Sequence, residues 1–165
     1  MKNKEKVYSV AAILLIIDQF VKLLIKTKMK VLTEIKIIPN FFSIYYVKNK
    51  GAAFSILNGK TYIFIVVAII LLFLIDRYLK EEKFTKLSII SLGMIIGGIV
   101  GNLIDRLLYH SVIDYLSFNI FGYNFPVFNI ADIGITVGCL LYIIELIRRS
   151  INESKSRSRK KDKNR

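Results

Sequence analysis

Two aspartates, Asp114 and Asp132, are the side chains of this sequence best placed to carry out acid–base chemistry. Asp114 lies in a loop without lysine or arginine, and Asp132 follows FNIA at the start of an apolar segment. Two carboxylates that lie close together cannot both ionise readily, so one keeps a proton while the other can deprotonate water. An aspartic hydrolase needs this arrangement. Spacing alone leaves a second role open, because Asp132 could instead be the N-cap of a helix.

Other residue types offer poorer catalytic schemes. His110 is the only histidine and Cys139 the only cysteine, so neither a Cys–His nucleophile pair nor a zinc site is expected. GKTY at 59–62 lacks the upstream glycines of a phosphate-binding loop. We therefore expect no metal and no other cofactor.

Four apolar segments must position the two carboxylates. The chain has 165 residues, 54% of them hydrophobic, which is more apolar surface than a soluble domain of this size can bury. A helix of about 20 residues crosses the roughly 30 Å of bilayer hydrocarbon. We predict an α-helical membrane protein with one domain at 1–149 and a basic tail at 150–165. The predicted spans are residues 7–25, 61–79, 87–108 and 130–147.

The net charge of +13 is unevenly distributed and predicts an orientation. Lysine and arginine gather at residues 2–6, at 77–86 and in the tail, which places both termini in the cytoplasm and Asp114 and Asp132 at the outer face. The lysine-rich first outer loop fits this rule poorly. The tail lacks the aromatic residues or motif of a nucleic-acid binder, so we expect a disordered segment near anionic lipid headgroups.

The outer loop at about 30–58 contains two runs that favour β-structure, residues 41–47 and 52–57. The intervening KNKG resembles a hairpin turn. Two interpretations remain open from the pattern alone. The runs could pair in a small sheet, or the loop could be anchored at the membrane interface by its aromatic side chains.

Several ionisable residues lie inside the predicted spans, where each is costly. Asp18 and Lys22 are four residues apart and can pair with each other. Asn102, Asp105 and Arg106 share one helix face. Asp105 and Arg106 could each find partners on neighbouring helices. We expect the four charged residues mainly to hold the helices together.

Five motifs in this sequence resemble those of the lipoprotein signal peptidases, the type II signal peptidases of bacterial membranes. They cover the predicted membrane core in the order found in that family. The resemblance implies an aspartic endopeptidase that removes signal peptides from prolipoproteins, cleaving just before a diacylglyceryl-modified cysteine. It also implies four helices with a small extracytoplasmic β-cradle and a half-helix. The motifs are DQFVK (18–22), NKGAAFSIL (49–57), GGIVGNLIDR (97–106), VID (112–114) and FNIAD (128–132).

The resemblance also assigns roles to individual residues by motif. Asp114 and Asp132 become the catalytic dyad. The implied partners are lipid-modified prolipoproteins and membrane lipids, with no nucleic acid and no obligate protein partner, in the bacterial cell membrane. The implied substrate-binding residues are Asn49, Gly51, Asn102, Arg106 and Asn129. The implied supporting polar residues are Asp18, Lys22 and Asp105.

Two positions depart from the family's pattern. His110 stands where the family usually has glycine, five residues after the aspartate of the Asp-Arg pair, and Tyr115 stands where phenylalanine is commoner. Neither change touches the dyad, but the geometry of the loop at His110 is in doubt.

Two other classes of function would use the same polar residues. An ion-coupled transporter would need alternating access, which four short spans without a clear repeat make hard to build. A membrane scaffold would act through the basic tail, and deleting 150–165 would then abolish its function.

Overall fold

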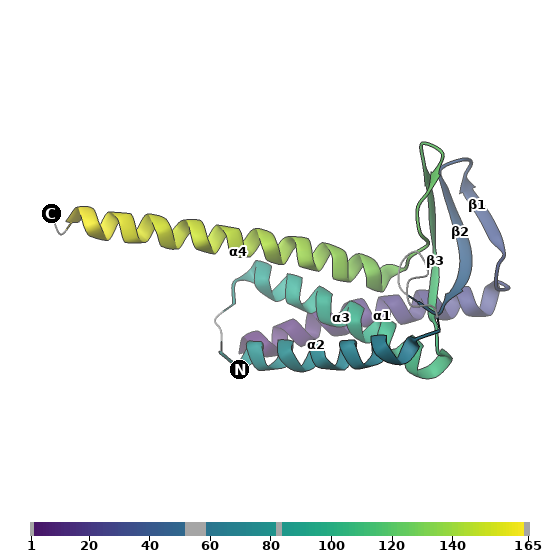
Figure 1. The fold of residues 1–165 in the computed structure, drawn as a ribbon, viewed down its shortest axis with the longest axis horizontal. Coiled ribbons are helices and arrows are strands. Elements are labelled where there is room, and N and C mark those ends of the chain that lie inside the picture. Colours follow the sequence, from purple (N-terminus) through teal and green to yellow (C-terminus); the bar gives the residue numbers. More distant parts are fainter. Residues whose placement is uncertain (1, 52–58, 82–83, 164–165) are drawn as a thin grey trace.

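The computed structural model describes residues 2–51, 59–81 and 84–163. Four helices lie side by side, and a small antiparallel sheet stands across one end of the bundle (Figure 1). Each helix is long and apolar enough to cross a membrane, so the prediction of four spans with a small sheet is confirmed. The helices are α1 (Lys2–Lys28), α2 (Thr61–Glu81), α3 (Lys86–Tyr109) and α4 (Ile130–Lys163); the strands are β1 (Glu34–Ile38), β2 (Phe42–Asn49), β3 (Val112–Ile120) and β4 (Tyr123–Asn124).

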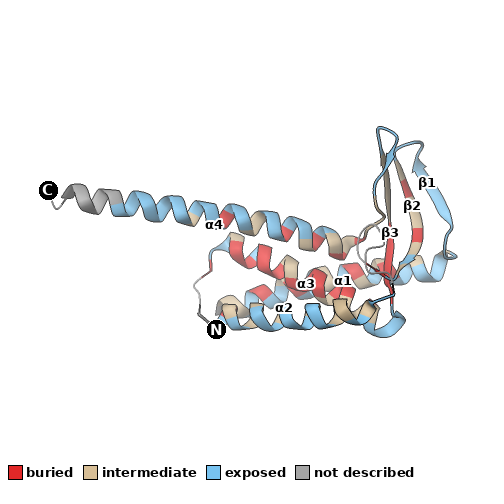
Figure 2. Ribbon diagram, in the orientation of Figure 1, coloured by how far each residue is buried: buried red, intermediate tan, exposed pale blue. Residues whose placement is uncertain are grey.

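The helix α3 forms the centre of the bundle and is the most buried of the four (Figure 2). Glycines on α3 let its neighbours approach closely. A methyl group at Gly98 would collide with the main-chain oxygen of Ala131 on α4, and one at Gly101 would collide with the carboxylate of Asp18 on α1. These contacts bring the polar residues of α1, α3 and α4 together at the end of the bundle that carries the sheet.

The sheet has the order β1-β2-β3-β4. On β2 and β3, Asn49 pairs with Val112 and Val47 with Asp114. The predicted β-run at 41–47 therefore forms most of β2, which pairs with β1 and β3; the second run, 52–57, lies outside the described residues, as does most of the segment between β2 and α2. A small sheet is thus present, as the first alternative expected, whereas the pairing of the two runs with each other lies outside the described residues. No half-helix appears in the described residues.

The basic tail differs from the expected disordered segment, because α4 continues as a helix through residue 163. No glycine or proline follows Gly138, and lysine, arginine and glutamate have high helix propensity. The helix therefore extends well beyond the rest of the bundle at the end opposite the sheet (Figure 1).

A tight turn at His110 joins α3 to β3. His110 caps α3 in the left-handed conformation, with φ of 53°, and its main-chain N–H donates to the oxygen of Arg106. The hydroxyl of Thr61, the first residue of α2, donates to the main-chain oxygen of His110 at 3.0 Å. A left-handed residue is most easily a glycine, which gives a physical reason for the glycine that usually occupies this place in the family.

Candidate active site

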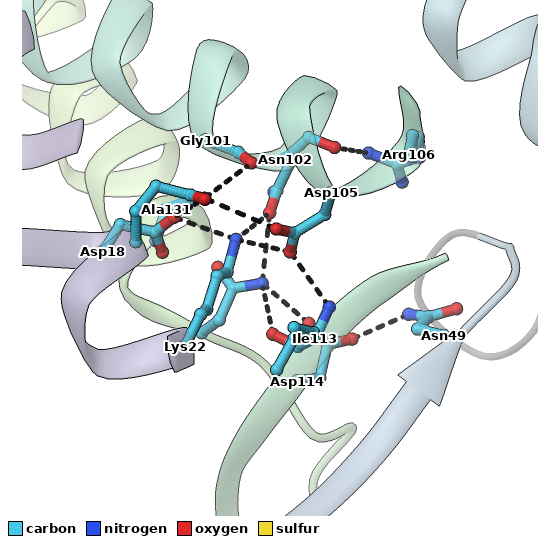
Figure 3. Close-up of polar contacts among 12 residues, drawn as sticks. Asp18, Lys22, Asn49, Gly101, Asn102, Asp105, Arg106, Ile113, Asp114 and Ala131 are labelled. Carbon is cyan, nitrogen blue, oxygen red and sulfur yellow. Dashed lines mark hydrogen bonds and ion pairs between the residues drawn. The ribbon is translucent and has the colours of Figure 1, made fainter. Parts of the chain in front are cut away.

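Asp114 lies near the start of β3 with its carboxylate fixed by two amides. The side chain is buried, Asn49 Nδ2 donates to Oδ2 at 2.9 Å, and Asn129 Nδ2 donates to Oδ1 at 2.7 Å. The close-up in Figure 3 shows Asn49 reaching Asp114 from the neighbouring strand. The strand pairing of β2 with β3 therefore positions this carboxylate.

Asp132 lies in the first turn of α4 and is held in a similar way. Asn102 Nδ2 on α3 donates to Asp132 Oδ1 at 2.7 Å, and the main-chain N–H of Asn129 donates to Oδ2 at 3.2 Å. Asn129 Oδ1 in turn accepts the N–H of Asp132 at 2.9 Å. This reciprocal pair begins α4, with Asn129 as the cap and Asp132 at the third helical position. The N-cap role considered for Asp132 is therefore wrong, because Asn129 occupies the N-cap; Asp132 lies inside the first turn and its side chain lines a cavity.

Asn129 joins the two aspartates. The residue is fully buried, its side-chain nitrogen contacts Asp114, and its main-chain nitrogen contacts Asp132. The same side-chain nitrogen donates to Asn102 Oδ1 at 3.1 Å. Asp114 on β3 and Asp132 on α4 are thereby held at one place by neutral hydrogen-bond donors.

The electrostatics of the site favour a proton on Asp114. Burial and, after it, the neighbouring charge of Asp132 raise the pKa of the Asp114 carboxyl to about 7, against the opposing hydrogen bonds from Asn49 and Asn129. A carboxyl group with this pKa can hold a proton at neutral pH.

A cavity of about 490 Å³ contains both carboxylates at its polar end. Its apolar walls come from α2, α3, α4 and the segment 125–128. Val67 and Leu71 of α2 line it and are also 46% and 42% exposed, so the cavity reaches the surface of the bundle that would face lipid. An apolar chain can enter such a site from the side.

Arg106 lines the same cavity. Its guanidinium lies over the ring of Phe64 on α2, 4.8 Å from the centroid, and donates to the main-chain oxygens of Gly51 and Asn102, each at 3.4 Å. It makes no ion pair with a carboxylate in the part of the chain described. We expected Arg106 mainly to hold helices together. In the structure, its remaining N–H donors are available inside the cavity.

Lys22 forms the centre of a second polar cluster next to the first. Its ammonium group contacts Asp18 Oδ2 and Asp105 Oδ2, each at 2.9 Å, and all three side chains are buried (Figure 3). Asp18 Oδ1 accepts the N–H of Ala131 on α4, and Asp105 Oδ2 accepts the N–H of Ile113 on β3. The predicted Asp18–Lys22 pair is present, and Asp105 finds its partner on α1, as expected of a residue that holds helices together.

Sequence reasoning missed Gln19. Its Nε2 lies within hydrogen-bond distance of Asp18 Oδ2 and the main-chain oxygen of Gly101, each at 3.2 Å, and of Asp105 Oδ1 at 3.4 Å. The signal was an amide in the middle of an apolar run, directly after Asp18. The structure brings all the predicted site residues to this end of the bundle.

Comparisons with known proteins give the class and the family. The family model described as signal peptidase (SPase) II matches residues 10–148. The lipoprotein signal peptidases of Staphylococcus aureus strains JH9 and Newman are each 39% identical over 145 residues, covering 87% of this chain and 89% of theirs. Two bacterial membrane enzyme structures superpose with TM-scores of 0.80 and 0.75, at 37% and 38% identity, covering 88% and 85% of this chain and 90% and 91% of theirs.

These matches show that the chain is a membrane peptidase. Within it, the chain belongs to the lipoprotein signal peptidase family, which cleaves signal peptides from prolipoproteins. The aspartic mechanism is known for this family. The peptidase function thereby takes precedence over the transporter and scaffold alternatives.

Proposed function

We propose that Asp114 and Asp132 are the catalytic dyad of this peptidase. The observation that carries the proposal is their common fixation by Asn129 at the polar end of one cavity. The dyad holds one proton. The ionised carboxylate takes a proton from water, which attacks the scissile carbonyl carbon, while the protonated carboxyl donates to the carbonyl oxygen.

The remaining residues of the cavity bind and orient the substrate. Asn49 and Asn102 each donate to one oxygen of an aspartate, and Asn129 donates to the other, so both carboxylates line the cavity in fixed orientations. Arg106 presents guanidinium donors to the substrate main chain, next to Gly51. Asp18, Lys22 and Asp105 support the site by fixing the starts of α4 and β3.

The substrate is a prolipoprotein whose cysteine carries diacylglycerol. Its apolar signal segment and acyl chains enter from the bilayer between α2 and α4, where the cavity reaches the surface. The scissile bond then lies at the membrane boundary, where water is available. The lysine and arginine at 2–6, at 77–86 and in the tail support cytoplasmic termini and a site at the outer face.

The direct test compares a diacylglyceryl-modified precursor with its unmodified twin, with the products measured by mass spectrometry. We expect a cut just before the modified cysteine and little cleavage of the twin. Asp114→Asn and Asp132→Asn should each abolish the cut, since an amide cannot exchange the proton. Glu34→Gln on the exposed strand β1 is the matched control and should cleave normally. Wild-type rates in both aspartate variants would refute the dyad.

A further inference from the structure

Among the described residues that line the cavity, Thr136 carries the one side-chain hydroxyl. The other polar lining residues among those described include both aspartates of the dyad and the side chains that contact them, whereas the lining also includes apolar residues such as Val67, Leu71 and Ile135. Thr136 follows Asp132 by four residues on α4. It therefore lies on the same helix face, about 6 Å further along the helix axis.

This hydroxyl is available for a ligand. A threonine in a helix commonly donates to a main-chain oxygen three or four residues earlier. Thr27 of α1 does so, with its hydroxyl 2.8 Å from the oxygen of Leu23 and 3.1 Å from that of Leu24. Thr136 makes no hydrogen bond within the described part of the chain, and the residue is exposed and is among those that line the cavity.

The main chain of the substrate needs hydrogen-bond partners near the scissile bond, and such a hydroxyl can be one of them. A peptide bond can be attacked only where the chain is extended, so the residues before the scissile bond cannot remain helical. Their N–H and C=O groups then lack partners, and an unpaired main-chain group in an apolar environment costs several kcal/mol. At the level of the dyad, Arg106 lines the cavity and has guanidinium donors for the main chain. One helical turn away, Thr136 is the polar side chain that the described lining offers.

We propose that the Thr136 hydroxyl binds the main chain of the signal peptide about two residues before the scissile bond. The position follows from geometry, since an extended chain advances about 3.3 Å per residue and Thr136 lies about 6 Å from Asp132 along the helix axis. The hydroxyl binds the main chain of the signal peptide and not a side chain. The contact can therefore hold the extended peptide in register in substrates of different sequence. The inference rests on the proposed dyad, because Asp132 marks the scissile position.

The experiment measures kcat and KM for a lipid-modified precursor in detergent micelles. Thr136→Val removes the hydroxyl at constant shape and should raise KM about three- to tenfold, the effect of one neutral hydrogen bond. The value of kcat should stay unchanged, because the bond is present in both the bound substrate and the transition state. Thr136→Ser restores the hydroxyl and should restore KM. Thr27→Val is the matched control and should leave both constants unchanged.

A substrate with a main-chain ester tests the partner. An ester in place of the amide linkage two residues before the cut removes an N–H and weakens the carbonyl acceptor. It should raise KM for the wild type and have no further effect on Thr136→Val, because the two changes remove the same bond. Additive effects would refute the contact, as would a normal KM in Thr136→Val or a serine variant that behaves like valine. Failure of the dyad is separate, since it would appear as cleavage by Asp114→Asn and Asp132→Asn.

Discussion

Two pairs of aspartates lie side by side in this protein and are stabilised in opposite ways. Asp18 and Asp105 share the ammonium group of Lys22, at 2.9 Å each. Asp114 and Asp132 are held by amide and main-chain donors, and within the described residues neither has an ion-pair partner. The partner therefore decides the role: Lys22 ties two carboxylates into the packing of the elements around it, whereas neutral donors leave Asp114 able to hold a proton at neutral pH.

Asn102 connects the two clusters. Its side-chain oxygen accepts from Lys22 Nζ at 3.0 Å and from Asn129 Nδ2 at 3.1 Å, while its nitrogen donates to Asp132. With the oxygen bound by donors, the amide nitrogen must face the aspartate. The lysine-centred cluster thus fixes the orientation of a group that holds the dyad, without supplying a charge to it directly.

The largest expected effect is that of Asp114→Asn, which should remove activity without lowering stability. Asp114→Asn should lower kcat/KM by about 10³-fold or more, because the dyad loses its exchangeable proton. The same variant should unfold at the same or a higher temperature at pH 8, since the wild type then keeps a buried charge. Cleavage and the thermal midpoint are measured on one preparation. A lower midpoint with retained cleavage would reverse the assignment.

Lys22→Met should give the opposite result. The substitution leaves Asp18 and Asp105 buried without their cation, which costs about 3–5 kcal/mol of unfolding free energy. Reversible denaturation in mixed micelles measures the loss. Lys28→Met, on the exposed end of the same helix, is the control and should change stability by less than about 0.5 kcal/mol. Equal stability of the two variants would show that the lysine-centred cluster is not structural.

The pH dependence of cleavage should reflect the raised pKa of Asp114. Cleavage should fall as the pH rises above about 7, because Asp114 then loses its proton. Its folded pKa lies above the unfolded value of about 4, so its contribution to stability also declines between about pH 4 and 7.

Removing one of the amide side chains that donate to Asp114 should shift this pH dependence. Asn49 donates to the ionised carboxylate, so Asn49→Ala should raise the pKa of Asp114 and move the alkaline limb of kcat/KM up by about one pH unit. The kcat/KM profile of each enzyme measures the limb. An unmoved limb would show that Asp114 does not control it.

The smallest effect concerns the turn between the clusters, since His110 lies between Asp105 on α3 and Asp114 on β3. His110→Gly relieves the left-handed strain and should raise the unfolding free energy by about 0.5–1 kcal/mol, after the entropy cost of glycine. Cleavage should be unchanged. His110→Ala keeps a Cβ atom and should give no gain; a gain equal to that of glycine would show that backbone strain is not the cause.

The four apolar helices, the membrane class and most of the polar residues that gather at the sheet end of the bundle could be predicted from the sequence. Apolar runs of membrane length admit little besides helices, because the backbone must satisfy its own hydrogen bonds in lipid. Polar residues inside such runs stand out because they are costly there, which is how Asp18, Lys22 and Asn102 were found.

Apart from the Asp18–Lys22 pair, the partner of each carboxylate depends on the tertiary structure. Asp105 is adjacent to Arg106 in sequence, yet Lys22 from another helix contacts it, and Arg106 faces the cavity. The strand pairing that brings Asn49 to Asp114, and the packing that brings Asn102 to Asp132, join segments that are 65 and 30 residues apart. Such long-range contacts leave no periodic trace in the sequence, because they depend on how closely the helices pack at Gly98 and Gly101.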